Sequence, residues 1–214
     1  FHWTERRRLL DKAWDVVVLQ EFSTHDRDKP GDATDYRTYA PMFAPMFART
    51  NPRVNVLLMA TWARADLVYR PGSPWSGKPL TAMTADLRRA ADGVQAVSPA
   101  FKNVLPVGDA WMRAIATGVA DGNPYDGVAF GQIDLWTYDH YHASAYGYYL
   151  EALIVFGRVT GIDPTTLGAR ERAADDLGLD PRLVPVLQRI ARDQLAAARR
   201  DDRSLASRRP RRDL

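Results

Sequence analysis

The sequence predicts an α/β protein built on a parallel sheet. Three short runs rich in aliphatic residues, DVVVLQ at 15–20, VNVLLMA at 54–60 and NVLPV at 103–107, are typical of strands buried on both faces. Between the second and third runs, residues 84–97 repeat apolar side chains at the period of a helix, with Thr84 expected to cap it. A strand, a helix and another strand in this order indicate right-handed crossovers between parallel strands.

Further helices are predicted from apolar periodicity and from residues that start or stop helices. They are expected at residues 35–49, 144–160, 165–177 and 181–200. Ser144 is expected to cap the second of these, and Gly161 to end it. That helix is apolar on most of its surface, so we expect it to be buried against the sheet.

Composition and charge set the domain organisation and exclude several classes of protein. The 214 residues fit one domain, predicted at 1–200, followed by a basic, disordered tail at 201–214. The chain has no cysteine, so disulfide scaffolds, thiol nucleophiles and cysteine-ligated metal sites are excluded, and no apolar run is long enough to span a membrane. Residues 199–214 hold seven arginines and three aspartates, a charge of +4, so the remaining charge is 3 − 4 = −1. Because the positive charge is confined to this tail, the charge distribution argues against a nucleic-acid-binding domain.

The segment with most chemical information is DLWTYDHYHASAYGYYLEA at 134–152, where Asp139 precedes His142 by three residues. On a loop, this spacing lets the carboxylate accept a hydrogen bond from imidazole Nδ1 and orient the ring as a general base. An accidental meeting of polar residues on a surface loop is the alternative. A metal site formed by Asp134, Asp139, His140 and His142 is a third possibility, but nothing else in the sequence completes a ligand shell, so no metal is expected.

Four blocks in order make the chain similar to the SGNH (GDSL-like) hydrolases, and to an uncharacterised branch of that superfamily. They are WDVVVLQEFST at 14–24, MATWAR at 59–64, VLPVGDAW at 104–111 and DHYHASAYGYYLEAL at 139–153. The resemblance implies a flavodoxin-like, three-layer α/β/α fold with strand order 2-1-3-4-5. It also implies a Ser–His–Asp triad that hydrolyses esters and needs no cofactor.

The resemblance assigns roles to four residues of this sequence, and position in the predicted sheet suggests one for a fifth. It makes Asp139 the orienting acid and His142 the general base. Gln20 stands where the family places an oxyanion-hole side chain, normally asparagine, and Thr61 is a weaker candidate for the same rim. Ser23, which also follows a predicted strand, is a candidate for a substrate-facing hydroxyl or a substitute nucleophile.

One part of the family pattern is missing. The family nucleophile lies in a Gly-Asp-Ser or Gly-Asn-Ser turn after the first strand, and no such turn precedes DVVVLQ. We therefore expect a flavodoxin-like sheet without its first strands, in a fragment of a longer hydrolase. Residues 15–20 would then form an exposed edge strand through which copies of the chain could associate.

The function expected from this resemblance is hydrolysis of acyl esters of carbohydrate or lipid, by a chain that lacks its own nucleophile. The alternative is a catalytically inactive relative that binds a carbohydrate or a protein partner. The aromatic side chains available for such binding are those of Trp62, Trp75, Trp111, Trp136, Tyr138 and Tyr141. The resemblance also suggests an exported or periplasmic protein, but the residues before Trp14 contain no apolar signal-peptide segment, so the compartment is unassigned.

Overall fold

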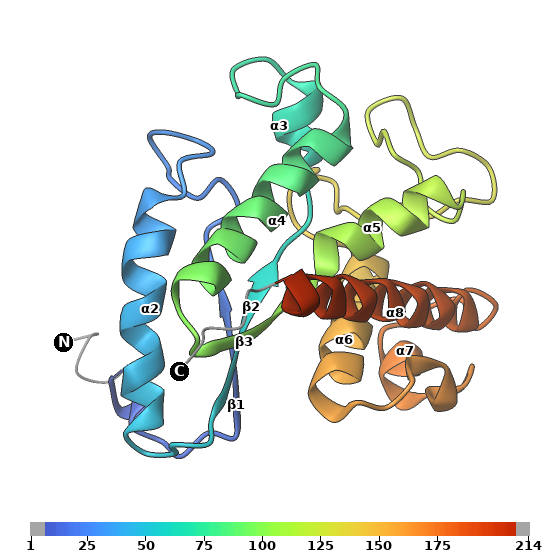
Figure 1. Cartoon of the computed structure of the whole chain (residues 1–214). Helices are drawn as coiled ribbons and strands as arrows, with labels where there is room; N and C mark the ends of the chain where they lie inside the picture. The colour runs from blue at the N-terminus through green and yellow to red at the C-terminus, as the bar shows by residue number, and fades with distance from the viewer. Residues whose placement is uncertain (1–6, 209–214) are drawn as a thin grey trace.

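The computed structural model describes residues 7–208, with side chains described as far as residue 200. Three parallel strands form one sheet in the order β1 (Val16–Gln20), β2 (Asn55–Ala60) and β3 (Phe101–Pro106). All three predicted strands are confirmed to within two residues at each end, and their order is the one expected for the last three strands of a 2-1-3-4-5 sheet. Helices surround this sheet (Figure 1).

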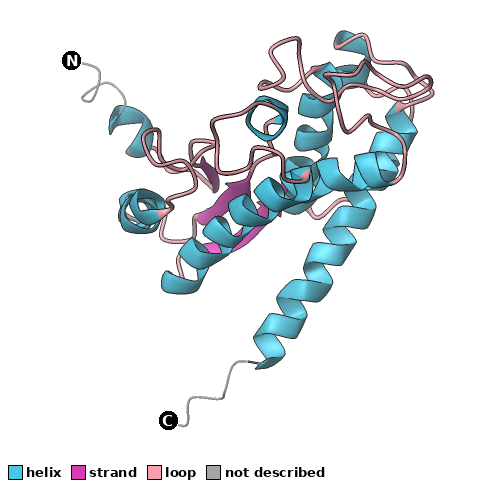
Figure 2. Cartoon of the chain, turned by 90° about the horizontal axis from the view of Figure 1, so that it is seen from above, coloured by secondary structure: helices cyan, strands magenta, loops and turns pink. Residues whose placement is uncertain are grey.

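Alternation along β2 divides the interior into two apolar clusters, one on each face of the sheet. Val56, Leu58 and Ala60 face the cluster that contains α2 (Thr34–Ala48) and the second half of α4 (Leu80–Val97). Leu57 and Met59 face the cluster formed with the helices that follow β3. The sheet therefore lies between two helical layers, as Figure 2 shows from above. This arrangement is consistent with a flavodoxin-like fold.

The helix predicted at residues 35–49 is confirmed as α2, although it contains Pro41 and Pro45. Its buried side chains, Tyr36, Ala40, Ala44 and Phe47, recur every three or four residues and form one stripe against the sheet layer. Burial of this stripe offsets the two backbone hydrogen bonds that the prolines cannot donate.

The helix predicted at residues 84–97 is found, but it begins four residues earlier. Pro79 precedes its first turn in an extended conformation, and Thr84 is not the cap. The Thr84 hydroxyl instead donates to the Leu80 carbonyl oxygen at 3.1 Å, inside the helix. A short helix, α3 (Ala65–Tyr69), was not predicted, because five residues are too few to show a helical period.

The helix α5 (Val107–Ala116) follows β3 directly and passes very close to the end of β2. A Cβ atom at position 108 would overlap the carbonyl oxygen of Thr61. Glycine is required at Gly108 for this close approach, which brings the ends of β2 and β3 together at one edge of the sheet.

The predictions for the ends of α6 (Ala145–Thr160) are confirmed. The Ser144 hydroxyl accepts a hydrogen bond from the Gly147 amide at 3.3 Å, and Gly161 ends the helix in the left-handed conformation with φ of 73°. Tyr149, Leu150, Leu153 and Ile154 are buried, so the helix packs along the interior as expected.

The prediction for the C-terminal third was wrong in two respects. One helix was expected at 165–177, but there are two short ones, η1 (Pro164–Leu167) and α7 (Arg172–Asp176). Gly168 separates them with φ of 77° and ψ of 176°, which no helix can continue through. The last helix, α8 (Val184–Arg208), includes residues 201–208, which were assigned to a disordered tail. Residues 201–208 contain neither Gly nor Pro, so no residue in this segment breaks the helix. The rest of the predicted tail, residues 209–214, lies outside the described residues.

The strand β1 pairs with β2 along one side and has no strand on its other side among the described residues. Its Val16–Leu19 side chains are half-buried, whereas five of the six residues of β2 are buried. Association through this edge stays a prediction.

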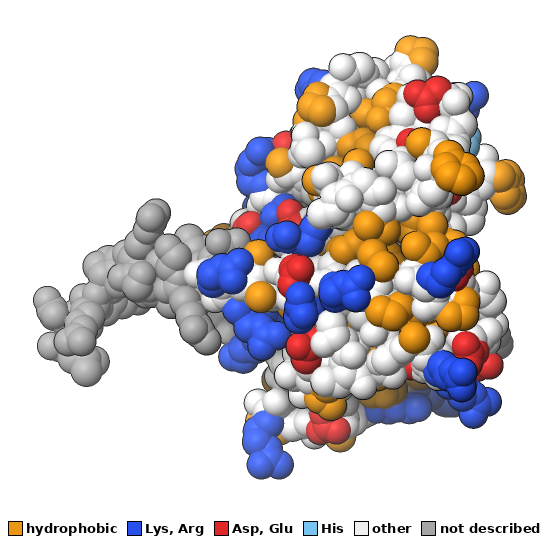
Figure 3. Space-filling model, turned by 90° about the vertical axis from the view of Figure 1, so that its right-hand side faces the viewer, with side chains coloured by type: hydrophobic (Ala, Val, Ile, Leu, Met, Phe, Trp, Pro, Cys, Tyr) orange, Lys and Arg blue, Asp and Glu red, His pale blue; other side chains and the backbone are white. Residues whose placement is uncertain are grey.

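No helix in the described part of the chain is long and apolar enough to cross a bilayer. Figure 3 shows scattered Lys and Arg side chains on one face, around apolar groups, without the continuous basic stripe typical of nucleic-acid binding.

Candidate functional site

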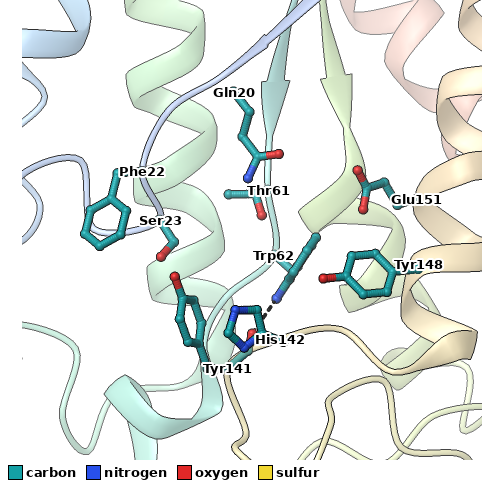
Figure 4. A pocket seen from close by; sticks show the side chains of 9 residues that line it. All are labelled: Gln20, Phe22, Ser23, Thr61, Trp62, Tyr141, His142, Tyr148 and Glu151. Atoms are coloured by element: carbon teal, nitrogen blue, oxygen red, sulfur yellow. Dashed lines mark hydrogen bonds between the residues drawn. The ribbon is translucent and has the colours of Figure 1, made fainter. Parts of the chain in front are cut away.

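A cavity of about 280 Å³ lies where the carboxyl ends of β1 and β2 meet the start of α6. Ligand sites in parallel α/β sheets form at this edge. The residues that line it are Gln20, Phe22, Ser23, Thr61, Trp62, Tyr141, His142, Tyr148 and Glu151 (Figure 4). Four of the five residues singled out from the sequence therefore line one cavity, and Asp139, the fifth, lies behind His142.

Asp139 holds the imidazole of His142 in one orientation. Asp139 Oδ2 lies 2.6 Å from His142 Nδ1, the contact that the spacing predicted. Hydrogen bonds from the Thr137 hydroxyl and from His142 keep the pKa of Asp139 well below its usual value, so the carboxylate is ionised. An ionised carboxylate only accepts hydrogen bonds, so the proton of the neutral ring is on Nδ1 and the lone pair is on Nε2.

The turn that contains this pair is fixed by backbone hydrogen bonds. Asp139 Oδ1 accepts from the amides of Tyr141 and His142, each at 2.9 Å. The Thr137 amide donates to the His142 carbonyl oxygen at 2.8 Å, and Trp136 and Ala143 form an antiparallel bridge. The acid therefore supports the turn as well as the imidazole, and both partners are placed before any substrate binds.

A stack of tryptophans holds the turn against the sheet. Trp62, two residues after β2, donates from Nε1 to the Tyr141 carbonyl oxygen at 3.0 Å, as drawn in Figure 4. Its ring stacks on Trp111 with centroids 4.9 Å apart, and Trp111 packs against the edge of Trp136. The position of His142 is thus tied to the end of β2 through its neighbour Tyr141.

Arg64 lies under the same turn and is neutralised there. Its guanidinium carbon is 3.6 Å from the centroid of the Tyr141 ring, and Nε and Nη2 donate to the Asp66 carboxylate at 3.0 and 2.6 Å. The third contact, from Nη1 to the Ser23 hydroxyl at 3.4 Å, joins the loop after β1 to this group. Ser23 is buried, and no hydrogen bond joins it to His142 within the described residues.

Gln20 and Thr61 lie where oxyanion donors could act. Gln20 is the last residue of β1 and is exposed, and Thr61 is buried at the end of β2. Figure 4 shows the two side chains close to each other at the top of the cavity. Neither side chain has a hydrogen-bond partner among the described residues, so both have free polar atoms to offer a ligand.

The residues considered for a metal site do not converge. His140 has a φ of 57°, which turns its ring away from His142 and onto Tyr125, with centroids 4.3 Å apart. Asp134 borders a different cavity, of about 770 Å³, formed with the turn before α8. Within the described residues, no three His, Asp or Glu side chains are arranged to hold a metal ion.

The sequence did not identify several residues of the cavity, and it misplaced most of the aromatic candidates. Trp75, Trp111 and Trp136 are fully buried in the core, and Tyr138 projects into solvent. Only Trp62 and Tyr141 of that set line the cavity, where Phe22, Tyr148 and Glu151 join them. One signal for Glu151 was available, because it is the acidic residue in the otherwise apolar run that forms α6.

Comparison with known proteins supports the fold. No protein-family model matches the sequence, and no curated protein matches it. The structure is similar to the crystal structure of a DUF4886 family protein from Bacteroides uniformis, with a TM-score of 0.64 and 18% sequence identity. At this identity the likeness shows the fold alone. The matched region covers 89% of this chain but only 66% of that one, so this chain spans less than two thirds of the length of its structural neighbour.

Proposed function

We propose that the cavity is the acid–base part of an SGNH-type esterase site that acts on acyl esters of carbohydrate or lipid. The observation that carries this proposal is the 2.6 Å contact between Asp139 and His142 at the carboxyl edge of a parallel sheet. Asp139 leaves the lone pair of His142 Nε2 available, which is what a general base requires.

The proposed reaction uses a serine hydroxyl from outside residues 1–214. His142 Nε2 takes the hydroxyl proton as the serine oxygen attacks the ester carbonyl, and Asp139 stabilises the imidazolium that forms. The Gln20 amide and the Thr61 hydroxyl would donate hydrogen bonds to the oxyanion. The imidazolium then gives its proton to the leaving alcohol, and water, activated by the same His142, releases the acid.

A fluorophosphonate probe, which reacts with activated serines, tests this proposal. We expect the protein expressed from its complete reading frame to be labelled at one serine outside residues 1–214, and the His142→Ala variant to lose the label. Mass spectrometry of the labelled peptide identifies the serine. A label on Ser23 would place the nucleophile inside this chain, and a label that persists without His142 would contradict the proposed base.

A second candidate function is binding without catalysis. It is favoured by one observation, that no hydroxyl among the described residues forms a hydrogen bond with His142 Nε2. In that case the cavity would hold a carbohydrate or a partner, with Trp62 and Tyr141 as contact surfaces. The probe distinguishes the two, because a binding protein would show no labelled serine that depends on His142.

A further inference from the structure

The cavity has an unusual combination of walls. Four aromatic side chains line it, those of Phe22, Trp62, Tyr141 and Tyr148. Figure 4 shows Phe22 and Tyr141 on one side, Tyr148 and Glu151 on the other, and Trp62 between them. Glu151 is the only acid among the lining residues, and none of them is Lys or Arg. The lining therefore joins electron-rich rings to one carboxylate, and His142 is its one basic side chain.

Within the described part of the chain, Glu151 has no partner that would stabilise its charge. It lies on α6, one turn after Tyr148, and is half-buried. No described residue forms a hydrogen bond or an ion pair with its carboxylate. Burial raises the pKa of Glu151, because the ionised form loses water and gains nothing in return. A cation placed in the cavity would remove this cost.

Arg64, the arginine that packs on Tyr141, does not fill that role. Arg64 does not line the cavity, and it is already engaged by the Tyr141 ring and by two hydrogen bonds to Asp66. Its charge is balanced by Asp66 within the protein. The carboxylate of Glu151 is consequently left for a ligand.

We propose that this cavity recognises a cationic ammonium group, and that Glu151, with the surrounding aromatic rings, is the residue that selects it. Aromatic faces attract cations through their quadrupoles, and a desolvated carboxylate adds a direct charge interaction. An anionic group would meet Glu151 without a lysine or arginine in the cavity wall to offset the repulsion. The substrate class that follows rests on the proposed function. If the protein is an esterase, its substrates are esters that carry an ammonium group.

Choline and its uncharged carbon isostere, in which the quaternary nitrogen is replaced by carbon, test the proposal as a matched pair. Binding of each to the protein is followed by NMR titration of the indole and amide signals. We expect choline to bind about tenfold more tightly than the isostere, and Glu151→Gln to reduce this preference to less than about twofold. The glutamine keeps the size and shape of the side chain and removes its charge.

Two further variants complete the design. Asp175→Asn removes an exposed carboxylate on α7, outside the cavity, and is expected to leave the preference unchanged. Tyr148→Leu removes an exposed ring and should weaken choline binding even if Glu151→Gln fails to fold. The proposal is wrong if choline does not bind at millimolar concentration, if the isostere binds equally well, or if Glu151→Gln retains the preference.

The titration does not depend on turnover, so its result is separate from the esterase proposal. A choline preference that depends on Glu151, in a protein that no fluorophosphonate labels, would support the cation site and contradict the esterase proposal. Fluorophosphonate labelling without a choline preference would support the esterase proposal and contradict the cation site.

Discussion

Replacing His142 by alanine is expected to lower kcat/KM for a short-chain p-nitrophenyl ester by about a thousandfold or more, in the protein expressed from its complete reading frame. The side chain is more than half exposed, and the turn around it is held by the Asp139 carboxylate and by backbone amides. The fold should therefore survive the substitution. The loss would come from the missing proton acceptor and would appear in kcat.

His140 provides the matched control, because it is the same residue type two positions away and points elsewhere. Asparagine tolerates its left-handed backbone, so His140→Asn should fold and change turnover by less than about threefold. Comparable losses in both variants would show that the turn as a whole, and not the imidazole of His142, is required. Unchanged turnover in His142→Ala would contradict the proposed base.

The largest effect on stability is expected from Gly147→Ala. A Cβ atom at this position in the first turn of α6 would overlap the Leu135 carbonyl oxygen and lie 2.6 Å from the Trp111 ring. Trp111 is fully buried between Trp62 and Trp136, so it has no room to move. We expect a loss of about 3 kcal/mol, measured by urea unfolding, and displacement of the turn that carries His142.

Gly93→Ala is the control for this prediction. Gly93 lies inside α4, and a Cβ atom there would meet nothing within 4 Å. Alanine should stabilise the helix by about 0.5–1 kcal/mol, because it reduces the freedom of the unfolded chain. If both substitutions change the free energy of unfolding in the same direction, crowding at Gly147 does not determine the effect of Gly147→Ala on stability.

Local patterns predicted those parts of the fold that depend on neighbouring residues. Short aliphatic runs predicted the three strands, and Ser144 and Gly161 predicted the ends of α6. The spacing of Asp139 and His142 predicted their contact, since a hydrogen bond within three residues needs only a turn. The errors in helix boundaries have local causes, because Pro79 allows α4 to begin after it and Gly168 separates η1 from α7.

The rest of the site depends on contacts between distant parts of the chain, which no local pattern contains. Trp62 reaches the carbonyl oxygen of Tyr141 across 79 positions, and nothing near either residue indicates that pairing. The same is true of Phe22 and Glu151, which the fold brings into one cavity from the loop after β1 and from α6. The aromatic residues were misjudged because composition does not distinguish a ring in the core, such as Trp75, from one that lines a cavity.

The state of the His142 ring tests the central interpretation most directly. Imidazole ¹⁵N chemical shifts, measured on the neutral ring, report which ring nitrogen carries the proton. We predict that Nδ1 is protonated and Nε2 is not, and that Asp139→Asn abolishes this preference. A ring protonated on Nε2, with shifts that do not change in Asp139→Asn, would contradict the assignment of His142 as a base oriented by Asp139.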